Sequence, residues 1–195
     1  MFYNWKAIIF GFCSVIVFVG FSCVRKVYSD DRMQIDPSFL NIFNSVTKKG
    51  SFSFRDSNNN RKAFIITNID SVISNQKGWF INEAPYKLLI MKFREVGPDT
   101  TQLERMNEIF VNKDPAANRN SLCIQFNNFY YSGDSLPSLN YDPLYVNGKI
   151  ITGYYFFKTS LDLKHSNDVK ELYISAGKGF LGFKTSSGEF WSNEE

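Results

Sequence analysis

The sequence predicts one mainly β domain, formed by a single antiparallel curved sheet, a sandwich or a half-barrel, with a helix at its N-terminal end. Aromatic residues are abundant, with 20 Phe and 10 Tyr among 195 residues, and aromatic side chains favour strands. Short apolar runs also alternate with polar residues and are separated by turns rich in Gly and Asn, which is typical of antiparallel sheets. We expect residues 36–195 to form this domain.

The helix is expected to begin at Asp36 and Pro37. An Asp side chain can accept hydrogen bonds from first-turn amides, and Pro suits the first helical position. Gly50 is expected to end the helix about 12 residues later. Its apolar face would consist of Phe39, Leu40, Phe43 and Val46, which recur at helical spacing.

Four strands are expected next. Residues 51–54 alternate between polar and apolar, and residues 62–69 are apolar and β-branched. Turn-forming residues at 56–60 lie between these two segments, which should therefore form a hairpin. Residues 79–81 and 87–93 are the other two candidate strands.

The middle of the chain is more ambiguous. Thr101 and Glu104 fit a capping box, which favours a short second helix over residues 101–110. Residues 111–120 are polar and are interpreted as a loop. Apolar and other residues then alternate over 122–126, as expected for a strand with one buried face.

The last third has the clearest turn signals. Asn147 and Gly148 lie between two short apolar runs, and this dipeptide favours a type I′ hairpin turn because both positions require a positive φ. Residues 132–143 are expected to form a long loop. The remaining strands are expected at residues 154–157, 171–175, 180–183 and 189–191, the last three as an antiparallel meander.

The N-terminal segment has the parts of an export signal. Lys6 precedes an apolar run over residues 7–22, and the small residue Ser22 stands at its end. A short positive region, an apolar core and a small residue before the cleavage point define such a signal. We therefore interpret residues 1–22 as a signal peptide and residues 23–35 as a polar tether.

The junction Val19-Gly20-Phe21-Ser22-Cys23 resembles the lipobox of bacterial lipoproteins. In that family, signal peptidase II cuts before a cysteine that carries diacylglycerol. The resemblance implies that Cys23 is the lipid attachment site. It also implies a bacterial cell envelope location, with the domain anchored to a membrane and facing the periplasm or the cell surface.

Two alternatives for this segment stay open. A transmembrane helix needs about 20 mostly apolar residues, a length that residues 7–24 approach. Arg25 and Lys26 come directly after the run, and positive charge there favours a cytoplasmic location for the rest of the chain. An uncleaved anchor would thus hold a cytoplasmic domain. The other alternative is an ordinary cleaved signal without a lipid.

The last third contains four successive motifs: Val146-Asn147-Gly148-Lys149, a strand with Tyr173, the segment 177–183, and the closing segment 188–191. In these motifs the chain resembles the C-terminal part of uncharacterised exported lipoproteins of the Bacteroidota. These motifs form turns and strands and carry no characterised activity. The resemblance therefore implies a location in the cell envelope and a twisted antiparallel sheet.

Composition argues against several function classes. The net charge is only +3 and no dense basic cluster occurs, so no nucleic acid partner is expected. His165 is the only histidine, and with Cys23 acylated, Cys123 would be the one cysteine left in the mature chain. The usual zinc sites need three or four such ligands. We predict no metal site, no cofactor and no catalytic residue.

Aromatic residues on both faces of two predicted strands are the candidate ligand-binding residues. They are Tyr130, Tyr131, Tyr154 and Tyr155. Some of these rings could line a groove for an apolar, peptide or glycan ligand. Packing in a large core is the alternative interpretation.

The expected function is therefore a non-enzymatic envelope lipoprotein that binds a partner or ligand, or serves structurally. Its expected partners are the membrane, through the N-terminal lipid, and a small ligand or an envelope protein. The alternative is an envelope hydrolase that acts through acidic loop residues, of which the candidates are Asp134, Asp142, Asp162, Asp168 and Glu171.

Overall fold

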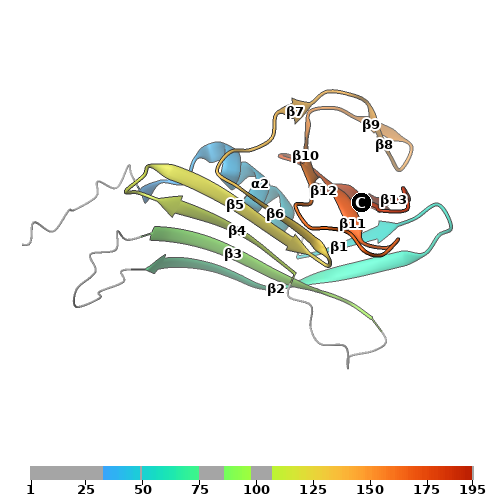
Figure 1. Ribbon diagram of the computed structural model, residues 1–195, viewed down its shortest axis with the longest axis horizontal. Helices are drawn as coiled ribbons and strands as arrows, with labels where there is room; N and C mark the ends of the chain where they lie inside the picture. Colours follow the sequence, from blue (N-terminus) through green and yellow to red (C-terminus); the bar gives the residue numbers. More distant parts are fainter. Residues whose placement is uncertain (1–32, 49, 75–85, 98–106, 195) are drawn as a thin grey trace, which may run out of the picture.

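The computed structural model describes residues 33–48, 50–74, 86–97 and 107–194. Within these residues, eleven strands form one antiparallel sheet that curls into a half-barrel (Figure 1). The strand order is β6-β5-β4-β3-β2-β1-β13-β12-β11-β10-β7. The predicted fold class is confirmed, with one helix among the described residues.

The strands of the large sheet are β1 (Ser51–Arg55), β2 (Arg61–Ser74), β3 (Tyr86–Glu95), β4 (Asn107–Asp114), β5 (Arg119–Phe126), β6 (Phe129–Gly133), β7 (Leu139–Asn140), β10 (Tyr154–Lys158), β11 (Val169–Ser175), β12 (Gly179–Thr185) and β13 (Phe190–Asn193). Two further strands, β8 (Leu144–Val146) and β9 (Lys149–Ile151), form a separate hairpin. The pairing of β1 with β13 joins the two halves of the chain into one sheet.

Helix α2 (Pro37–Thr47) packs against the inner face of the sheet, over β4, β11 and β12. Asp36 caps it by accepting a 2.8 Å hydrogen bond from the Ser38 amide, as predicted. The close approach of α2 to β12 depends on Gly179, because a Cβ at this position would lie 2.6 Å from the Ser45 carbonyl oxygen. The buried residues of the helix are Phe39, Ile42, Phe43 and Val46, with Leu40 partly buried beside them.

The main core lies inside the curl and is dominated by phenylalanine. Phe54 is fully buried at its centre, where its ring centroid lies 5.0 Å from that of Phe183 and 5.9 Å from that of Phe64. Strands from both halves contribute to this cluster, so the core holds the two halves of the sheet in one curved unit. Other rings in the cluster are Phe52, Phe93, Phe126 and Phe180.

The two ends of the sheet approach each other at one point. The Ser160 amide, just after β10, donates a 2.9 Å hydrogen bond to the Tyr130 carbonyl oxygen in β6. The Tyr130 amide in turn donates to Thr159 Oγ1 at 3.0 Å. These bonds pair the backbone amide and carbonyl groups of Tyr130 in β6, which is an edge strand of the sheet. Without them, both groups would be unpaired at the edge.

The β8–β9 hairpin covers a second, smaller core on the outer face of the sheet. Val146 and Ile151 of the hairpin pack with Tyr154 of β10 and Leu181 of β12. Asn147 and Gly148 at the hairpin tip have φ values of 49° and 71°. The predicted type I′ turn and its two strands are therefore confirmed.

Two predictions for the middle of the chain are wrong. Residues 107–110 belong to β4 and not to a second helix, and most of residues 111–120 continue β4 and start β5, with a turn at 115–118. The remaining residues of the predicted helix, 101–106, lie outside the described residues, as do the candidate strand 79–81 and all of residues 1–32.

The error has a physical cause. Every second residue of β4 is buried, but two of these inward residues are the polar Asn107 and Lys113. Asn107 Oδ1 accepts a 2.6 Å hydrogen bond from the Asn127 amide, and Lys113 Nζ donates to Asn118 Oδ1 at 2.9 Å. Partnered polar side chains thus occupy positions where a simple pattern requires apolar ones.

Candidate functional site

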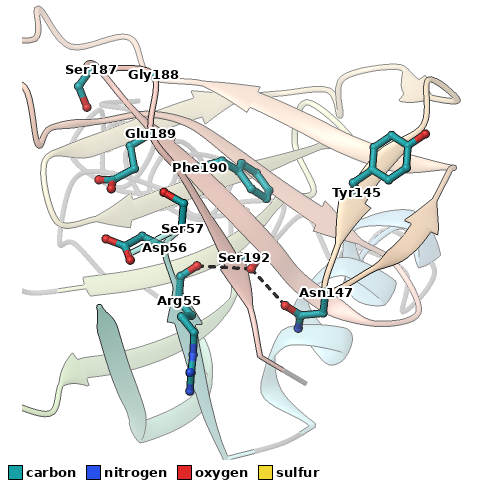
Figure 2. A pocket seen from close by; sticks show the side chains of 10 residues that line it. All are labelled: Arg55, Asp56, Ser57, Tyr145, Asn147, Ser187, Gly188, Glu189, Phe190 and Ser192. Carbon is teal, nitrogen blue, oxygen red and sulfur yellow. Dashed lines mark hydrogen bonds between the residues drawn. The ribbon is translucent and has the colours of Figure 1, made fainter. Parts of the chain in front are cut away.

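An open depression of about 670 Å³ lies between the β1–β2 turn, the β12–β13 turn and the β8–β9 hairpin (Figure 2). Its volume falls within the range of small-molecule sites. Figure 2 shows two carboxylates on one side, the hairpin on the other, and β13 between them. The lining residues are Arg55, Asp56, Ser57, Tyr145, Asn147, Ser187, Gly188, Glu189, Phe190 and Ser192.

Asp56 forms the first wall and is held rigidly by its own turn. Its Oδ1 accepts hydrogen bonds from the amides of Asn58 at 2.9 Å and Asn60 at 2.7 Å, and its Oδ2 accepts from Asn60 Nδ2 at 2.6 Å. Burial opposes ionisation of Asp56, but these hydrogen bonds outweigh it and lower the pKa of Asp56 below its ordinary value. Asp56 is therefore a fixed negative charge at neutral pH.

Glu189 lies beside Asp56 at the start of β13. Its Oε2 accepts a 3.1 Å hydrogen bond from Trp191 Nε1, and its side chain lines the same side of the depression as Asp56 (Figure 2). The tight turn that positions it requires Gly188, whose φ is 90°. Carboxyl oxygens accept hydrogen bonds, so this wall favours a ligand that donates them.

The floor of the depression is made by β13. Phe190 packs above Gly182, where a Cβ would lie 2.7 Å from Phe190 Cζ. Ser192 Oγ lies 3.2 Å from Asn147 Oδ1 and donates to it, which links the floor to the hairpin. An aromatic ring and a hydroxyl group thus lie side by side at the base (Figure 2).

The hairpin forms the opposite wall and exposes one aromatic ring. Tyr145 is 67% exposed, because Leu144 and Val146 on either side of it point into the small core. Asn147 Nδ2 donates a hydrogen bond to the Asn193 carbonyl oxygen. The exposed Tyr145 ring is therefore carried by a hairpin that is anchored at its tip and along its inner face.

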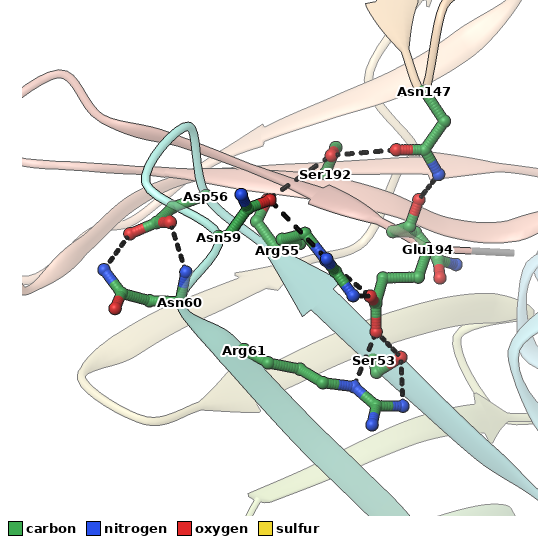
Figure 3. Close-up of polar contacts among 10 residues, drawn as sticks. Ser53, Arg55, Asp56, Asn59, Asn60, Arg61, Asn147, Ser192 and Glu194 are labelled. Carbon is green, nitrogen blue, oxygen red and sulfur yellow. Dashed lines mark hydrogen bonds and ion pairs between the residues drawn. The ribbon is translucent and has the colours of Figure 1, made fainter.

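A cluster of charged and polar residues on β1, on β2 and directly after β13 adjoins the depression through Arg55 (Figure 3). Glu194 accepts hydrogen bonds from Ser53 Oγ at 2.6 Å, Arg55 Nε at 2.7 Å and Arg61 Nε at 2.7 Å. The hydrogen bonds from Ser53 and Arg55, with that from Arg61, lower the pKa of Glu194 to about 2. Because Arg55 is engaged by Glu194, the local charge at the Asp56–Glu189 wall is negative.

The four tyrosines predicted from sequence lie in different surroundings. Tyr131 and Tyr155 pack on the main core, where the Tyr131 ring centroid lies 4.9 Å from that of Phe157. Tyr154 belongs to the core beneath the hairpin. Tyr130 lies near Cys123, the contact that raises its pKa. Tyr131 and Tyr155 therefore belong to the same core cluster, where both rings lie near Phe157, and the other two tyrosines lie elsewhere. The role of the four in ligand binding stays a prediction.

The other residues considered from sequence mostly have local roles. Cys123 is buried and its pKa is raised by burial. His165 is exposed, and its amide donates to Asp168 Oδ2 at 2.9 Å. Asp134 pairs with Arg119, and Glu171 accepts a hydrogen bond from the Tyr173 hydroxyl group. No group of three or more possible metal ligands occurs among the described residues.

Comparisons with protein families, with curated proteins and with solved structures give no match for this chain. Among the residues that the structure describes, no helix combines the length and the apolar character that a membrane span requires. Functional inference for this protein therefore depends on its own residues.

Sequence reasoning missed the residues that line the depression. The segment with Asp56 was interpreted only as a turn, and Glu189 only as the start of a strand. Tyr145 carried a usable signal, because it alternates with Leu144 and Val146 in a hairpin that the Asn147-Gly148 turn specifies, and it must point away from their face. An aromatic residue on the solvent side of a short hairpin is a feature that can be identified from sequence.

Proposed function

We propose that this protein is a membrane-tethered lipoprotein of the bacterial envelope whose β domain binds a ligand and catalyses no reaction. The observation that carries the proposal is the apolar run over residues 7–22, which ends at Ser22 and Cys23 and is followed by a polar segment. A lipid on Cys23 would anchor the chain, since each buried methylene adds about 0.8 kcal/mol and two or more chains anchor stably.

The position of the depression supports this proposal. The start of α2 lies beside the β4–β5 turn, where the Asp36 amide donates a 3.2 Å hydrogen bond to Asn120 Oδ1. Figure 1 places this point at one end of the molecule, and the β1–β2 turn and β8–β9 hairpin at the other. A domain tethered through its N-terminal side would therefore present the depression away from the membrane.

The surroundings of three acidic residues that the sequence suggested for a hydrolase argue against that role. Asp168 accepts hydrogen bonds from the amides of Lys164 and His165 and from Asn128 Nδ2. Asp134 and Glu171 also have partners within the fold. Carboxyl groups that stabilise turns and strands in this way are poorly placed to serve as a general acid or base.

The proposal is tested by following the protein in fractionated cells that express the chain with or without the substitution Cys23→Ala. We expect the parent to be recovered in the membrane fraction and to incorporate labelled palmitate. The Cys23→Ala variant should carry no label and should accumulate as uncut precursor or be released. Membrane recovery of both proteins without any label would contradict the proposal.

A further inference from the structure

We propose that this protein forms a dimer through the free edge of β2, defined here as residues 67–73. In this dimer the free edge pairs antiparallel with the same segment of a second copy, about a two-fold axis at Ser71. An exposed apolar strand edge can template such pairing, and a two-fold axis requires a surface that is complementary to itself. Self-association goes beyond the proposed function and does not depend on how the chain is held at a membrane.

The free edge is the part of β2 that extends beyond β1. Strand β1 pairs with β2 only from Arg61 to Ile65, whereas β3 pairs along β2 as far as Ser74. The Ile66 amide donates to the Gly50 carbonyl oxygen, and beyond this bond no strand of the described residues pairs with that side of β2. Figure 1 shows this part of β2 as the outermost strand on its side of the sheet. Its outward backbone groups are therefore open to pairing with another strand.

The free edge is exposed along its whole length and carries three large apolar residues. Ile69, Val72 and Ile73 are 51%, 41% and 59% exposed. Ile69 pairs with Met91, which is buried in the main core, so Ile69 lies on the inner face of the sheet. Ile73 lies on the same face, four residues further along the strand. The apolar inner face therefore extends from the core to the edge and is exposed there.

The two end strands of the sheet are protected in ways that the free edge of β2 is not. The backbone of Tyr130 in β6 is bonded to Thr159 and Ser160, and β7 has only two residues. Natural edge strands are often guarded by Lys, Pro or a bulge. Residues 67–73 contain neither Lys nor Pro, and the one irregularity, at residues 66–68, lies at their start. Asp70 is the only charged residue along the edge.

The order of the side chains selects the register of the dimer. In an antiparallel pair, two opposed residues either both bond to each other or both point away, so two identical edges must be centred on a residue. A centre at Asp70 would place two carboxylates directly opposite each other, which destabilises a sheet. A centre at Ser71 places Ile69 opposite Ile73 of the second copy, and Asp70 opposite Val72. No other centre pairs Ile69 with Ile73.

The same order favours a second copy over another protein as the occupant of the edge. An extended segment of any protein would gain the backbone hydrogen bonds of strand addition. A second copy also matches the apolar side chains by symmetry, because Ile69 and Ile73 lie at equal distances from Ser71 along the strand. Two Ile–Ile pairs then form, one on each side of the axis, and both continue the apolar inner face.

Charge substitutions at Ser71 test the proposed axis. The mass of the full chain in detergent is measured by analytical ultracentrifugation over a dilution series, and we expect the parent to form a dimer. Ser71→Lys and Ser71→Glu should each raise the dissociation constant of the dimer by about fivefold or more, because like charges meet at the axis. An equimolar mixture of the two variants should restore the dimer. Because Ser71 is exposed, the urea midpoints of both variants should match that of the parent.

A cysteine at the same position tests the geometry of the axis. Opposed residues of an antiparallel pair have Cα atoms about 4.5–5.5 Å apart, which a disulfide can span. Ser71→Cys should therefore give a disulfide-linked dimer under mild oxidation. Thr67→Cys is the matched control, because Thr67 is exposed on the same strand but would lie more than about 20 Å from its copy. The parent, oxidised in parallel, accounts for the three native cysteines.

Four results would overturn the proposed dimer. They are a monomeric parent, a dimer that neither Ser71→Lys nor Ser71→Glu weakens, a mixture of these variants that is no more dimeric than each alone, and equal cross-linking of Ser71→Cys and Thr67→Cys. A monomeric parent that binds a different protein, with this binding lost in Ser71→Lys, would assign the edge to another partner. These measurements concern β2 alone, so their failure leaves the proposed lipid on Cys23 unaffected.

Discussion

At the scale of single residues, Glu194 makes the stability of the domain depend on pH. Ser53, Arg55 and Arg61 donate hydrogen bonds to its carboxylate, and these bonds lower its pKa from 4.5 to about 2. The native state therefore favours the ionised form more than the unfolded chain does. The resulting stability is fully present above the ordinary carboxyl pKa and is lost as the pH falls from there through about 2.

The substitution Glu194→Gln tests this linkage. We expect the urea midpoint of the variant to lie below that of the parent at neutral pH, and the difference to shrink as the pH falls from about 4.5 towards about 2. Asp134→Asn is a suitable control, because the Asp134–Arg119 pair is exposed on both sides and surface pairs contribute little. A difference between parent and Glu194→Gln that stays constant over this pH range would contradict the linkage.

At the scale of single elements, the β8–β9 hairpin depends on its turn. Gly148 has a φ of 71°, a conformation that a β-branched residue tolerates badly. We expect Gly148→Val to lower the free energy of unfolding by more than about 1 kcal/mol. It should also loosen Tyr145, because both residues belong to the same short hairpin.

Urea denaturation of the variant measures this cost. Gly177→Val is the matched control, since Gly177 has open space around it and no positive φ. Equal stability of parent and Gly148→Val would show that this hairpin does not depend on a turn with positive φ.

Whether a helix or strand could be predicted from the sequence depends on whether polar residues occupy its buried positions. The hairpin at Asn147 and Gly148 and helix α2 were predictable because local turn and capping chemistry specifies them. Strand β4 was not, because the buried Asn107 and Lys113 interrupt its apolar pattern and find partners only in the folded chain. Local signals therefore identify turns and caps better than strands whose buried polar residues find their partners only after folding.

At the scale of the whole molecule, β13 is the strand that joins the two halves of the sheet. It pairs with β1 on one side and β12 on the other, and the Trp191 ring stacks on Phe183 with centroids 5.6 Å apart. Truncating a large buried aromatic side chain costs about 3–5 kcal/mol. Deletion of residues 190–195 should therefore unfold the domain or sharply lower its urea midpoint.

This deletion is checked by urea denaturation together with near-UV circular dichroism. Deletion of residues 194–195 alone keeps β13 and separates the loss of the strand from the loss of Glu194. A 190–195 deletion with the midpoint and near-UV spectrum of the parent would show that the C-terminal meander is peripheral and that β13 does not hold the two halves of the sheet together.

The candidate site illustrates the limit of sequence reasoning at this largest scale. The depression combines the β1–β2 turn, the β12–β13 turn and the β8–β9 hairpin. These segments meet only because β1 pairs with β13 and because the hairpin folds over the outer face of the sheet. Asp56 and Glu189 are far apart in sequence, and no local pattern indicates that they line the same depression.

The central claim is that the β domain is held at a membrane by a lipid on Cys23. An intact mass spectrum of the mature protein, with sequencing of its N-terminal peptide, tests this claim most directly. We expect residues 1–22 to be absent and the chain to begin at Cys23 with the added mass of a diacylglycerol group. A mature chain that begins at Met1, or that begins at Cys23 without added mass, would contradict the claim.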